Sequence, residues 1–364
     1  MVWAAQVFGT NVKCLPFTGD TPNTTRVAGL NQYQTAAAVS QAAWPDPFNP
    51  ETRAGMAILA RGDGLHYQDA LAASPLVHHP FNGPILLTEA DRLVDVTARE
   101  LLRLKPAGAG VPCVGLVHVL LVGDFSPFVE LQVKALGYAT HWIHGADVYA
   151  TAAAAADLLW HAGTILVVSG EDPSEGLPAG AFAAHMGIPL LLTRKDSLPQ
   201  ATADFIAHAV HPNVYVVGSL DTVSDIVLDA IDALTEGLVV RIDGFTPAQI
   251  AVEVSRYLSP AGDFGWGKMD PDGHAFRFSE VHAWQSAVTG NAFSHLGKHA
   301  PLLLVERWAV PPVVSQYLMS VNPLHVETKP PFMHGFIVGP THEVACPVQV
   351  ELEVLLRTVV EEPM

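Results

Sequence analysis

One short apolar run occurs three times in this chain, and this internal repetition constrains the fold more than any other feature. The runs read Gly83-Pro-Ile-Leu-Leu-Thr88, Ile188-Pro-Leu-Leu-Leu-Thr193 and Ala300-Pro-Leu-Leu-Leu-Val305. Their prolines are 105 and 112 residues apart. Self-similarity of this kind indicates one structural module that is used three times.

Two further landmarks accompany each run in the same order. Ahead of it stands a segment that ends in glycine, which reads Arg26-Val-Ala-Gly29, Ile143-His-Gly145 or Arg241-Ile-Asp-Gly244. Behind it stands an apolar segment that also ends in glycine, which reads Val119-Leu-Leu-Val-Gly123, Val214-Tyr-Val-Val-Gly218 or Phe336-Ile-Val-Gly339. Short apolar runs before a glycine are typical of buried parallel strands that turn into a loop.

Stretches with helical spacing separate these strands, for example at 67–79, 94–104 and 201–210. Strands that alternate with helices predict an α/β fold with parallel sheets, whose right-handed crossovers place helices on both faces. Because Gly137 and Gly237 follow helical stretches, as C-cap glycines do, we expect module boundaries at 1–139, 140–237 and 238–364. The third module also holds a segment rich in Gly, Pro and Asp at 259–274, which we expect to be a surface loop.

The composition is that of a folded chain with an acidic surface. Of its 364 residues, 49% are hydrophobic and 15% are charged, so the chain buries sizeable cores. The 19 Lys and Arg against 36 Asp and Glu give a net charge of −17. This charge excludes a nucleic-acid partner, which requires a basic footprint, and it disfavours an anionic polymer unless basic residues are concentrated locally.

Motifs of catalysis and of metal binding are missing from the sequence. It holds no Gly-x-Ser-x-Gly, Walker loop or dinucleotide fingerprint, so we predict no enzyme and no cofactor. Cys14, Cys113 and Cys346 have no zinc-ligand spacing, and we expect three buried free thiols. The 17 histidines include no His-Glu-x-x-His motif, so we expect them to be scattered and predict no metal site.

The chain also shows no membrane signals. The first residues have no basic region followed by a long apolar stretch, so we expect no signal peptide. The apolar stretch at 149–168 is interrupted by Asp157 and His161, which indicates a helix followed by a buried strand. We therefore predict no membrane insertion.

Taken together, the three landmarks resemble the cell wall binding repeat 2 family. Its pattern runs Arg-Ile-Ala-Gly-x-Asp-Arg-Tyr-x-Thr-Ala, then a strand, a glycine and an Asp-Ala-Leu helix, then Pro-Ile-Leu-Leu, and finally a Val-Gly-Gly strand end. The resemblance covers nearly the whole chain, strongly in the first two modules and weakly in the third. The matching motif residues, which we take as mostly structural, are Gly29, Asp69, Pro84, Ile85, Leu86, Leu87, Gly145, Pro189, Leu190, Leu191, Leu192, Gly244, Pro301, Leu302, Leu303 and Leu304.

The chain departs from the family pattern at three kinds of position. Trp142 replaces the arginine of the first landmark in the second module. The Asp-Ala-Leu helix becomes Gly176-Leu-Pro-Ala in the second module and is not recognisable in the third. The second glycine of the closing motif is Asp124, Ser219 or Pro340.

The resemblance implies three Rossmann-like or flavodoxin-like lobes around a pseudo-threefold axis, attached without catalysis to an anionic cell-wall polymer. Parallel sheets bind ligands at the carboxyl ends of their strands. The polymer-binding candidates are therefore the residues that follow the repeated strands, together with the arginine of the first landmark: Arg26, Thr88, Arg92, Thr193, Arg194, Lys195 and Arg307. Two alternatives stay open, namely solvated surface charge at the strand ends and, for Arg26, bracing of one lobe on the next.

Two functions remain compatible with the sequence. One is a cell-wall binding protein whose partner is an anionic polymer and whose location is the cell surface. The other is a structural or scaffold subunit that uses the same fold, has other protein subunits as partners, and lies in the cytoplasm or in an assembly. The basic residues at the strand ends favour the first, whereas the low charge density and the divergent third module favour the second.

Overall fold

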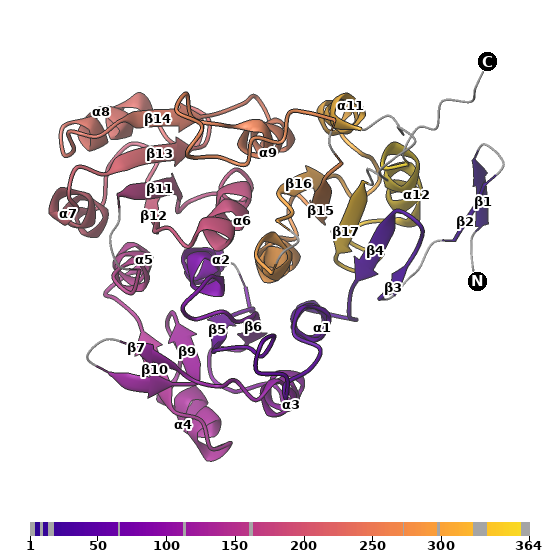
Figure 1. Ribbon diagram of the computed structural model, residues 1–364. Helices are drawn as coiled ribbons and strands as arrows, with labels where there is room; N and C mark the ends of the chain where they lie inside the picture. The colour runs from indigo at the N-terminus through magenta and orange to yellow at the C-terminus, as the bar shows by residue number, and fades with distance from the viewer. Residues whose placement is uncertain are drawn as a thin grey trace.

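The computed structural model describes the backbone of residues 4–7 and 10–13, and residues 18–64, 66–111, 114–159, 163–271, 273–296, 299–322 and 333–357 in full. Within these ranges, strands and helices alternate along the chain (Figure 1). The strands are joined mainly into parallel sheets. The prediction of an α/β fold with parallel sheets is therefore confirmed.

Three parallel sheets share one strand order. The first sheet runs β10 (Thr140–Ile143), β9 (Val119–Val122), β5 (Ala57–Arg61), β6 (Ile85–Thr88). The second runs β14 (Val239–Ile242), β13 (Asn213–Val217), β11 (Thr164–Ser169), β12 (Leu190–Thr193). The third runs β4 (Thr24–Val27), β17 (His334–Val338), β15 (Ala275–Glu280), β16 (Leu302–Val305), with β3 (Gly19–Asp20) antiparallel on β4.

The repeated apolar runs form the edge strands β6, β12 and β16, each of which ends its sheet. Each strand begins at the residue after the proline, which suits a residue that cannot donate a ladder hydrogen bond. The three aliphatic side chains after each proline are at most 1% exposed. Strands covered on both faces read as continuous apolar runs, so the sequence pattern follows directly from the burial.

The last parallel strand of each sheet, at the end opposite the repeated run, is supplied by the first strand of another copy of the repeat. Strand β10 pairs with β9, and β14 pairs with β13, although each opens the following copy of the repeat. Strand β4, near the N-terminus, pairs with β17, near the C-terminus, as the indigo and yellow ribbons show (Figure 1). The third sheet is thus completed by the start of the chain, and sheet membership crosses the module boundaries expected from the sequence.

The helix that follows each of β4, β10 and β14 packs on the next sheet. Helix α1 (Gln32–Ala43) contacts β6, α5 (Val148–Ala156) contacts β12, and α9 (Pro247–Arg256) contacts β16. Each begins at a polar cap, because the side chains of Asn31, Asp147 and Thr246 accept a hydrogen bond from a first-turn backbone N–H. The strand–helix connection therefore links each sheet to its neighbour.

Short helices from the three copies meet between the sheets. They are α2 (Tyr67–Ala72) with the 3₁₀ turn η1 (Ser74–Val77), α6 (Leu177–Met186), and α10 (Trp284–Thr289) with η2 (Gly290–Ser294). A Cβ added to Gly180 of α6 would lie 2.6 Å from Leu71 Cδ1, so only glycine allows this approach. Asn291 Nδ2 donates to Ser74 Oγ at 2.8 Å, and the fully buried Arg277 donates to Asn291.

The outer faces carry the remaining helices. They are α3 (Asp95–Leu104), α4 (Pro127–Ala135), α7 (Gln200–His208), α8 (Asp225–Asp232), α11 (Pro312–Val321) and α12 (Cys346–Leu355). Two antiparallel pairs, β1 (Ala4–Val7) with β2 (Thr10–Lys13) and β7 (Ala109–Val111) with β8 (Gly115–Val117), stand outside the three sheets. Across the described ranges, no helix has the length and hydrophobicity needed to span a bilayer.

The segment at 259–274 differs from a simple surface loop. Its described residues form no helix or strand, but Phe264 and Trp266 are only 7% and 8% exposed. Phe264 stacks on Tyr215 with ring centroids 4.0 Å apart, and both aromatic residues contact Phe182 of α6. The segment therefore attaches the third module to the second through buried aromatic contacts, which its Gly, Pro and Asp content does not indicate.

The expectation of three free thiols is wrong. Cys346, the first residue of α12, is disulfide-bonded. With three cysteines far apart in the sequence, pairing depends on tertiary proximity, which spacing alone does not provide. The expectation about a signal peptide falls on a stretch whose side chains lie outside the described residues.

Candidate functional site

The glycine of the first landmark fixes the start of the helix that follows it. The backbone N–H of Gly29 donates to Thr35 Oγ1 at 3.1 Å, and that of Gly145 donates to Thr151 Oγ1 at 3.0 Å. A Cβ added to Gly29 would lie 2.3 Å from Gln34 Cβ. The spacing of glycine and threonine in the motif therefore serves the turn that carries the chain from one sheet to the next.

Arg26 is buried and bound entirely within the protein. Its side chain donates to Gln349 Oε1 at 3.1 Å and to the carbonyl oxygens of Gly339 at 2.7 Å and Val344 at 2.9 Å. Burial lowers the pKa of Arg26 to about 10, which the Glu343 carboxylate opposes, so the guanidinium stays charged at neutral pH. These contacts are those of the bracing alternative.

Trp142 and Arg241 occupy the position of Arg26 on β10 and β14 and make the same contact. Trp142 Nε1 donates to the Gly123 carbonyl at 2.8 Å, and Arg241 Nη1 donates to the Gly218 carbonyl at 2.9 Å. The residue change in the second module thus preserves the hydrogen bond to the closing glycine. Trp142 can replace the arginine of the family pattern in this hydrogen bond, because indole and guanidinium both supply an N–H donor.

Each closing glycine packs against an acid, which is buried at Asp69 and partly buried at Glu343. These glycines have positive φ, and a Cβ would lie 2.3 Å from Asp69 Oδ2 at Gly123 and 2.5 Å from Glu343 Oε2 at Gly339. Burial raises the pKa of both carboxyls to about 6. Nearby arginines oppose this shift.

Glu175 holds the corresponding place in the second module. It accepts hydrogen bonds from Ser219 N at 2.7 Å and from Ser219 Oγ at 2.9 Å, beside Gly218. Sequence reasoning missed both Glu175 and Glu343. Glu175-Gly-Leu stands where the first module has Asp69-Ala-Leu, so a comparison of acid type rather than of identity would have found it.

The carboxyl-terminal edge of a sheet, with the loops that follow it, is here called its rim. In the first rim, Thr88 is buried and donates to the Arg92 carbonyl at 2.9 Å. The Arg92 side chain is 64% exposed and pairs with Glu89 at 2.6 Å. Tyr33 of α1 faces the same charges, since burial raises its pKa, the carboxylates of Glu89 and Asp63 raise it further, and Arg92 opposes them.

The second rim repeats this arrangement. Thr193 is buried and donates to the Arg194 carbonyl at 3.1 Å. The guanidinium of Arg194 lies 4.7 Å from the centroid of the Tyr149 ring, and its Nη1 is 3.8 Å from Glu171. The Lys195 backbone N–H also donates to Glu171. Each of the first two rims therefore combines an exposed arginine, an acid and the tyrosine of the entering helix.

Each of these two rims receives a glutamine from a central helix that belongs to another copy of the repeat. Gln68 Nε2 of α2 donates to the Gly170 carbonyl in the second rim at 3.0 Å. Gln285 Nε2 of α10 reaches the Gly62 carbonyl in the first rim at 3.5 Å. The two rims are thus composite sites that the separate repeats do not contain on their own.

The third rim is built differently. Ala248 of α9 stands two residues after the helix cap, where α1 has Tyr33 and α5 has Tyr149. Arg307 instead lies 5.1 Å from the ring centroid of Trp308, which is 64% exposed. The third rim thus also has an arginine beside an aromatic ring, but here both residues are consecutive in one exposed segment.

A groove of about 670 Å³ lies at the carboxyl ends of β13 and β14, beside α9. Its lining includes two arginines, Arg241 and Arg256, and the almost fully exposed ring of Phe245. Asp221, Asp243 and Glu253 also line it, so the groove is mixed in charge. Its position at the strand ends is where α/β sheets bind ligands.

The family model for cell wall binding domain 2 matches residues 26–124 and 143–228, which is about half of the chain. The chain belongs to the cell wall binding domain 2 family. The match covers the first two rims and ends before the third module, whose rim differs most.

Two curated proteins of Bacillus subtilis resemble this cell wall binding domain 2 chain. The amidase enhancer is 30% identical over 250 residues, which cover 68% of this chain and 31% of the relative. The N-acetylmuramoyl-L-alanine amidase LytC is 27% identical over 238 residues, which cover 64% of this chain and 43% of the relative. The chain therefore spans less than half the length of the curated relatives it matches.

Two solved structures from Clostridium difficile share the fold. Cwp6 superposes with a TM-score of 0.74 over 97% of this chain and 51% of its own, at 18% identity. Cwp8 superposes with a TM-score of 0.72 over 92% of this chain and 52% of its own, at 19% identity. At these identities the likeness shows the fold alone.

The seven residues that the sequence suggests for polymer binding differ in their exposure to solvent. Arg26, Thr88 and Thr193 are buried. Arg92, Arg194 and Arg307 are exposed, one in each rim, and Lys195 is partly exposed beside Arg194. Because the exposed residues belong to three different sheets, they form separate local cationic positions.

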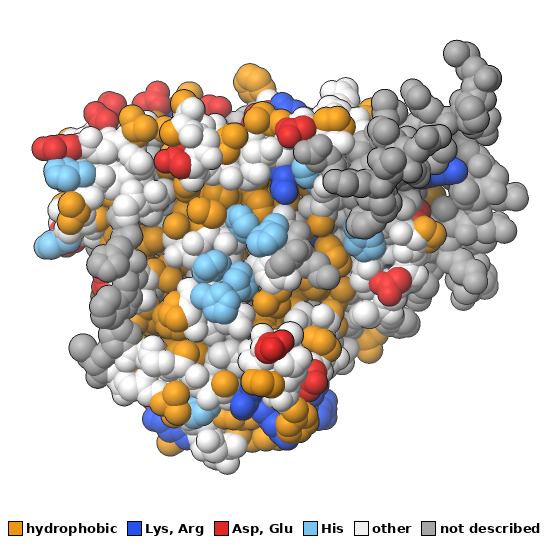
Figure 2. Space-filling view, viewed as in Figure 1, with side chains coloured by type: hydrophobic (Ala, Val, Ile, Leu, Met, Phe, Trp, Pro, Cys, Tyr) orange, Lys and Arg blue, Asp and Glu red, His pale blue; other side chains and the backbone are white. Residues whose placement is uncertain are grey.

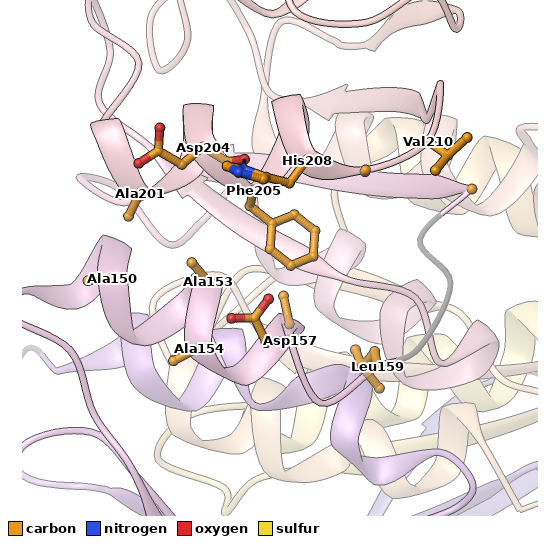
Figure 3. Close-up of a pocket in the computed structure, with 13 residues that line it drawn as sticks. Ala150, Ala153, Ala154, Asp157, Leu159, Ala201, Asp204, Phe205, His208 and Val210 are labelled. Carbon is orange, nitrogen blue, oxygen red and sulfur yellow. Dashed lines mark hydrogen bonds between the residues drawn. The ribbon is translucent and has the colours of Figure 1, made fainter. Parts of the chain in front are cut away.

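A second groove, of about 940 Å³, lies between α5 and α7 and away from the rims. Alanines of α5 form one wall, and the ring of Phe205 points into it from α7 (Figure 3). Two carboxylates, Asp157 and Asp204, line it, whereas its lining holds no Lys or Arg among the described residues. This charge disfavours an anionic ligand at the second groove.

Proposed function

We propose that this chain is a non-catalytic module that attaches to an anionic cell-wall polymer through its rims. The observation that carries the proposal is the set shared by the first two rims, where an exposed arginine pairs with an acid and the tyrosine of the entering helix stands nearby, in contact with the arginine in the second rim. Arginine binds phosphate and carboxylate groups through two parallel hydrogen bonds, and an aromatic ring holds its plane in place.

The arrangement of the sheets supports a ring of three lobes around a pseudo-threefold axis, with modules at 1–139, 140–237 and 238–364. The support is the common strand order and the return of β4 to the third sheet. In such a ring the three rims are related by rotation, so one polymer strand contacts more than one of them. Linked weak contacts of this kind give an avidity that a single site does not reach.

Arg194 is the residue most available to a ligand. Its distance of 3.8 Å to Glu171 is longer than the 2.6 Å between Arg92 and Glu89. The ion pair of Arg194 is therefore the weaker one, and less favourable interaction energy is lost when an anionic group of a ligand replaces the acid. Arg26 is left out of the polymer-facing set because its donors are bound inside the protein. Thr88 and Thr193 position the loops that carry the arginines.

The comparisons favour polymer binding over the scaffold alternative, because the matched family is defined by cell-wall binding. The disulfide at Cys346 also fits an oxidising environment outside the cell, where such bonds persist. We therefore place the chain at the cell wall. Its relative LytC is named as an amidase, but we propose no catalysis here, since the sequence carries none of the catalytic motifs sought in it.

A sedimentation assay with purified Gram-positive cell walls tests this function. We expect the chain to pellet with the walls at low salt and less at high salt, because ion pairs with a polymer are screened. Replacing Arg92 and Arg194 by alanine together should weaken binding by about tenfold, from two exposed ion pairs of about 1 kcal/mol or less each.

Lys134→Ala is the matched control, since Lys134 is half exposed and lies at the far end of α4 from the rim. Failure of the unmodified chain to pellet at low salt would contradict the function. Equal loss of binding in the control and in the double variant would contradict the assignment to the rims.

A further inference from the structure

Five histidines from all three copies of the repeat gather at one place. His78 and His79 follow η1, His185 lies in the last turn of α6, and His295 and His299 follow η2. Figure 2 shows histidine side chains concentrated near the middle of one face. These positions precede the strands β6, β12 and β16, so the cluster lies at the edge opposite the rims. The expectation of scattered histidines is wrong for these five.

The rings contact one another in two sets. His78, His79 and His295 form a triangle, with the ring centroid of His295 4.6 Å from that of His78 and 5.3 Å from that of His79. His185 and His299 have centroids 4.9 Å apart, and their Nδ1 atoms are 3.1 Å apart. Two ring nitrogens at this distance share one proton, so one ring donates and the other must be neutral to accept.

The inner side of the cluster is packed against the protein. His185 stacks on Trp266 at 4.1 Å with an interplanar angle of 13°. His295 is 8% exposed, and its Nε2 is buried without a hydrogen-bond partner. A Cβ added to Gly187, which ends α6, would lie 2.7 Å from His78 Nδ1. His295 is therefore enclosed and His78 and His185 are partly buried, whereas His79 and His299 are exposed at the outer side of the cluster.

Among the residues that the structure describes, the charges that act on the buried and half-buried rings of the cluster have the same sign. Those that act on His78, His185 and His295 come from one another, from His79 and His299, and from Lys268 of the segment at 259–274. Burial, and after it the neighbouring basic groups, lower the pKa of His185 to about 4 and that of His295 to about 3. Burial lowers the pKa of His78 as well.

We propose that the five-histidine cluster is a proton-sensitive junction that holds the three copies together while its rings are neutral, and that this contribution to stability weakens as the medium becomes acidic. Protonation removes the acceptor nitrogen of the His185–His299 pair and adds positive charge beside Lys268. Like charges beside the buried ring of His295 and the half-buried ring of His185 repel more strongly than in open water, because less water screens them. The response acts between modules, since no two of the three contributing segments belong to the same copy.

The sign of the effect follows from the direction of the shifts. A histidine whose pKa is lower in the folded than in the unfolded state binds more protons when unfolded, so stability is lost as the pH falls below the unfolded value of about 6.5. One such histidine decreases the folding equilibrium constant by about 20-fold between pH 7 and pH 5. Asp69 and Glu343 act in the opposite direction, because burial raises their pKa to about 6.

Comparing variants with the unmodified chain across pH cancels the effect of these carboxyls. The full chain and the variants His295→Leu and His185→Gln are unfolded with urea at pH 7 and at pH 5. Between pH 7 and pH 5, the folding equilibrium constant of the unmodified chain should fall about 20-fold more than that of each variant. His282→Gln, an exposed histidine outside the cluster, is the control and should follow the unmodified chain.

A titration of the unmodified chain by NMR of its imidazole nitrogens keeps the test independent of any variant. We expect two or more histidines to remain neutral at pH 5, where an ordinary histidine is charged. Titration of all histidines near pH 6.5, or the same pH dependence in the cluster variants and in His282→Gln, would overturn the proposal. A rise in stability on adding Zn²⁺ that EDTA reverses and that His295→Leu abolishes would overturn it too, in favour of a metal site.

Discussion

The first two rims and the third rim differ although their sheets share one strand order. In the first two, an exposed arginine lies beside an acid and a tyrosine from the entering helix, whereas Ala248 replaces that tyrosine in the third. The strand order depends on buried aliphatic residues, which many sequences supply. The rim depends on a few exposed side chains, so it diverges while the sheet beneath it stays the same.

The largest expected effect tests the contacts below the third rim. Arg26→Ala leaves Gln349 and two carbonyls without their donor and opens a cavity in a buried site, so we expect a loss of about 3–5 kcal/mol in the free energy of unfolding. Urea unfolding measures it. Arg241→Ala is the matched variant in the second sheet, where the side chain is 12% exposed and should lose less. Equal losses of unfolding free energy in the two variants would show that Arg26 stabilises the third sheet no more than Arg241 stabilises the second.

The next prediction compares a crowded closing glycine with an uncrowded one. Gly123 and Gly137 both have positive φ, but only the first has neighbours within 4 Å of an added Cβ, the nearest being Asp69 Oδ2. We expect Gly137→Ala to cost about 1 kcal/mol from backbone strain, and Gly123→Ala to cost about 2–4 kcal/mol because Asp69 must also move. If thermal unfolding gave the same loss for both, the acid would not restrict that position.

The buried acids predict a pH dependence that the rims do not share. Because the pKa of Asp69 is raised to about 6, the folded state binds a proton that the unfolded state releases, and stability is lost as the pH rises from about 4 to 7. This loss amounts to about 2–3 kcal/mol at pH 7. In Asp69→Asn the dependence should shrink by that amount, as measured by urea unfolding between pH 4.5 and 7.

Glu343→Gln should reduce the same dependence in the third module, since burial raises the pKa of Glu343 to about 6. Glu89→Gln is the control in the first rim, where Arg92 instead lowers the pKa of the exposed carboxyl. A pH profile unchanged in both buried variants would refute the assignment of these shifts.

The smallest expected effect compares the rims in binding. Arg194→Ala should weaken sedimentation with cell walls by about fivefold, and Arg307→Ala by about twofold or less, because the guanidinium of Arg194 is held between Tyr149 and Glu171 whereas Arg307 rests on the exposed Trp308. Circular dichroism of both variants checks that the fold is retained. A larger loss in Arg307→Ala would place the main contact in the divergent module.

The sequence predicted the α/β class, the repeated apolar strands and their spacing, because these depend on local apolar patterns and on turn glycines that any copy of the repeat must keep. It also predicted which arginines follow the strands. The role of Arg26 stayed open, since burial separates a bracing arginine from a ligand-binding one, and burial is a property of the surroundings.

Only the tertiary structure decided how the copies are joined. The return of β4 to the third sheet, the glutamines that reach the rims of other copies and the histidine cluster all join residues that are far apart in the chain. A repeat shows in the sequence because each copy keeps the same strands, turn glycines and strand–helix connection, and the pairing that joins one sheet to the next copy is repeated with them. The glutamines and the histidine cluster leave no such periodic signal, because these contacts are made by whichever side chains the packing brings together.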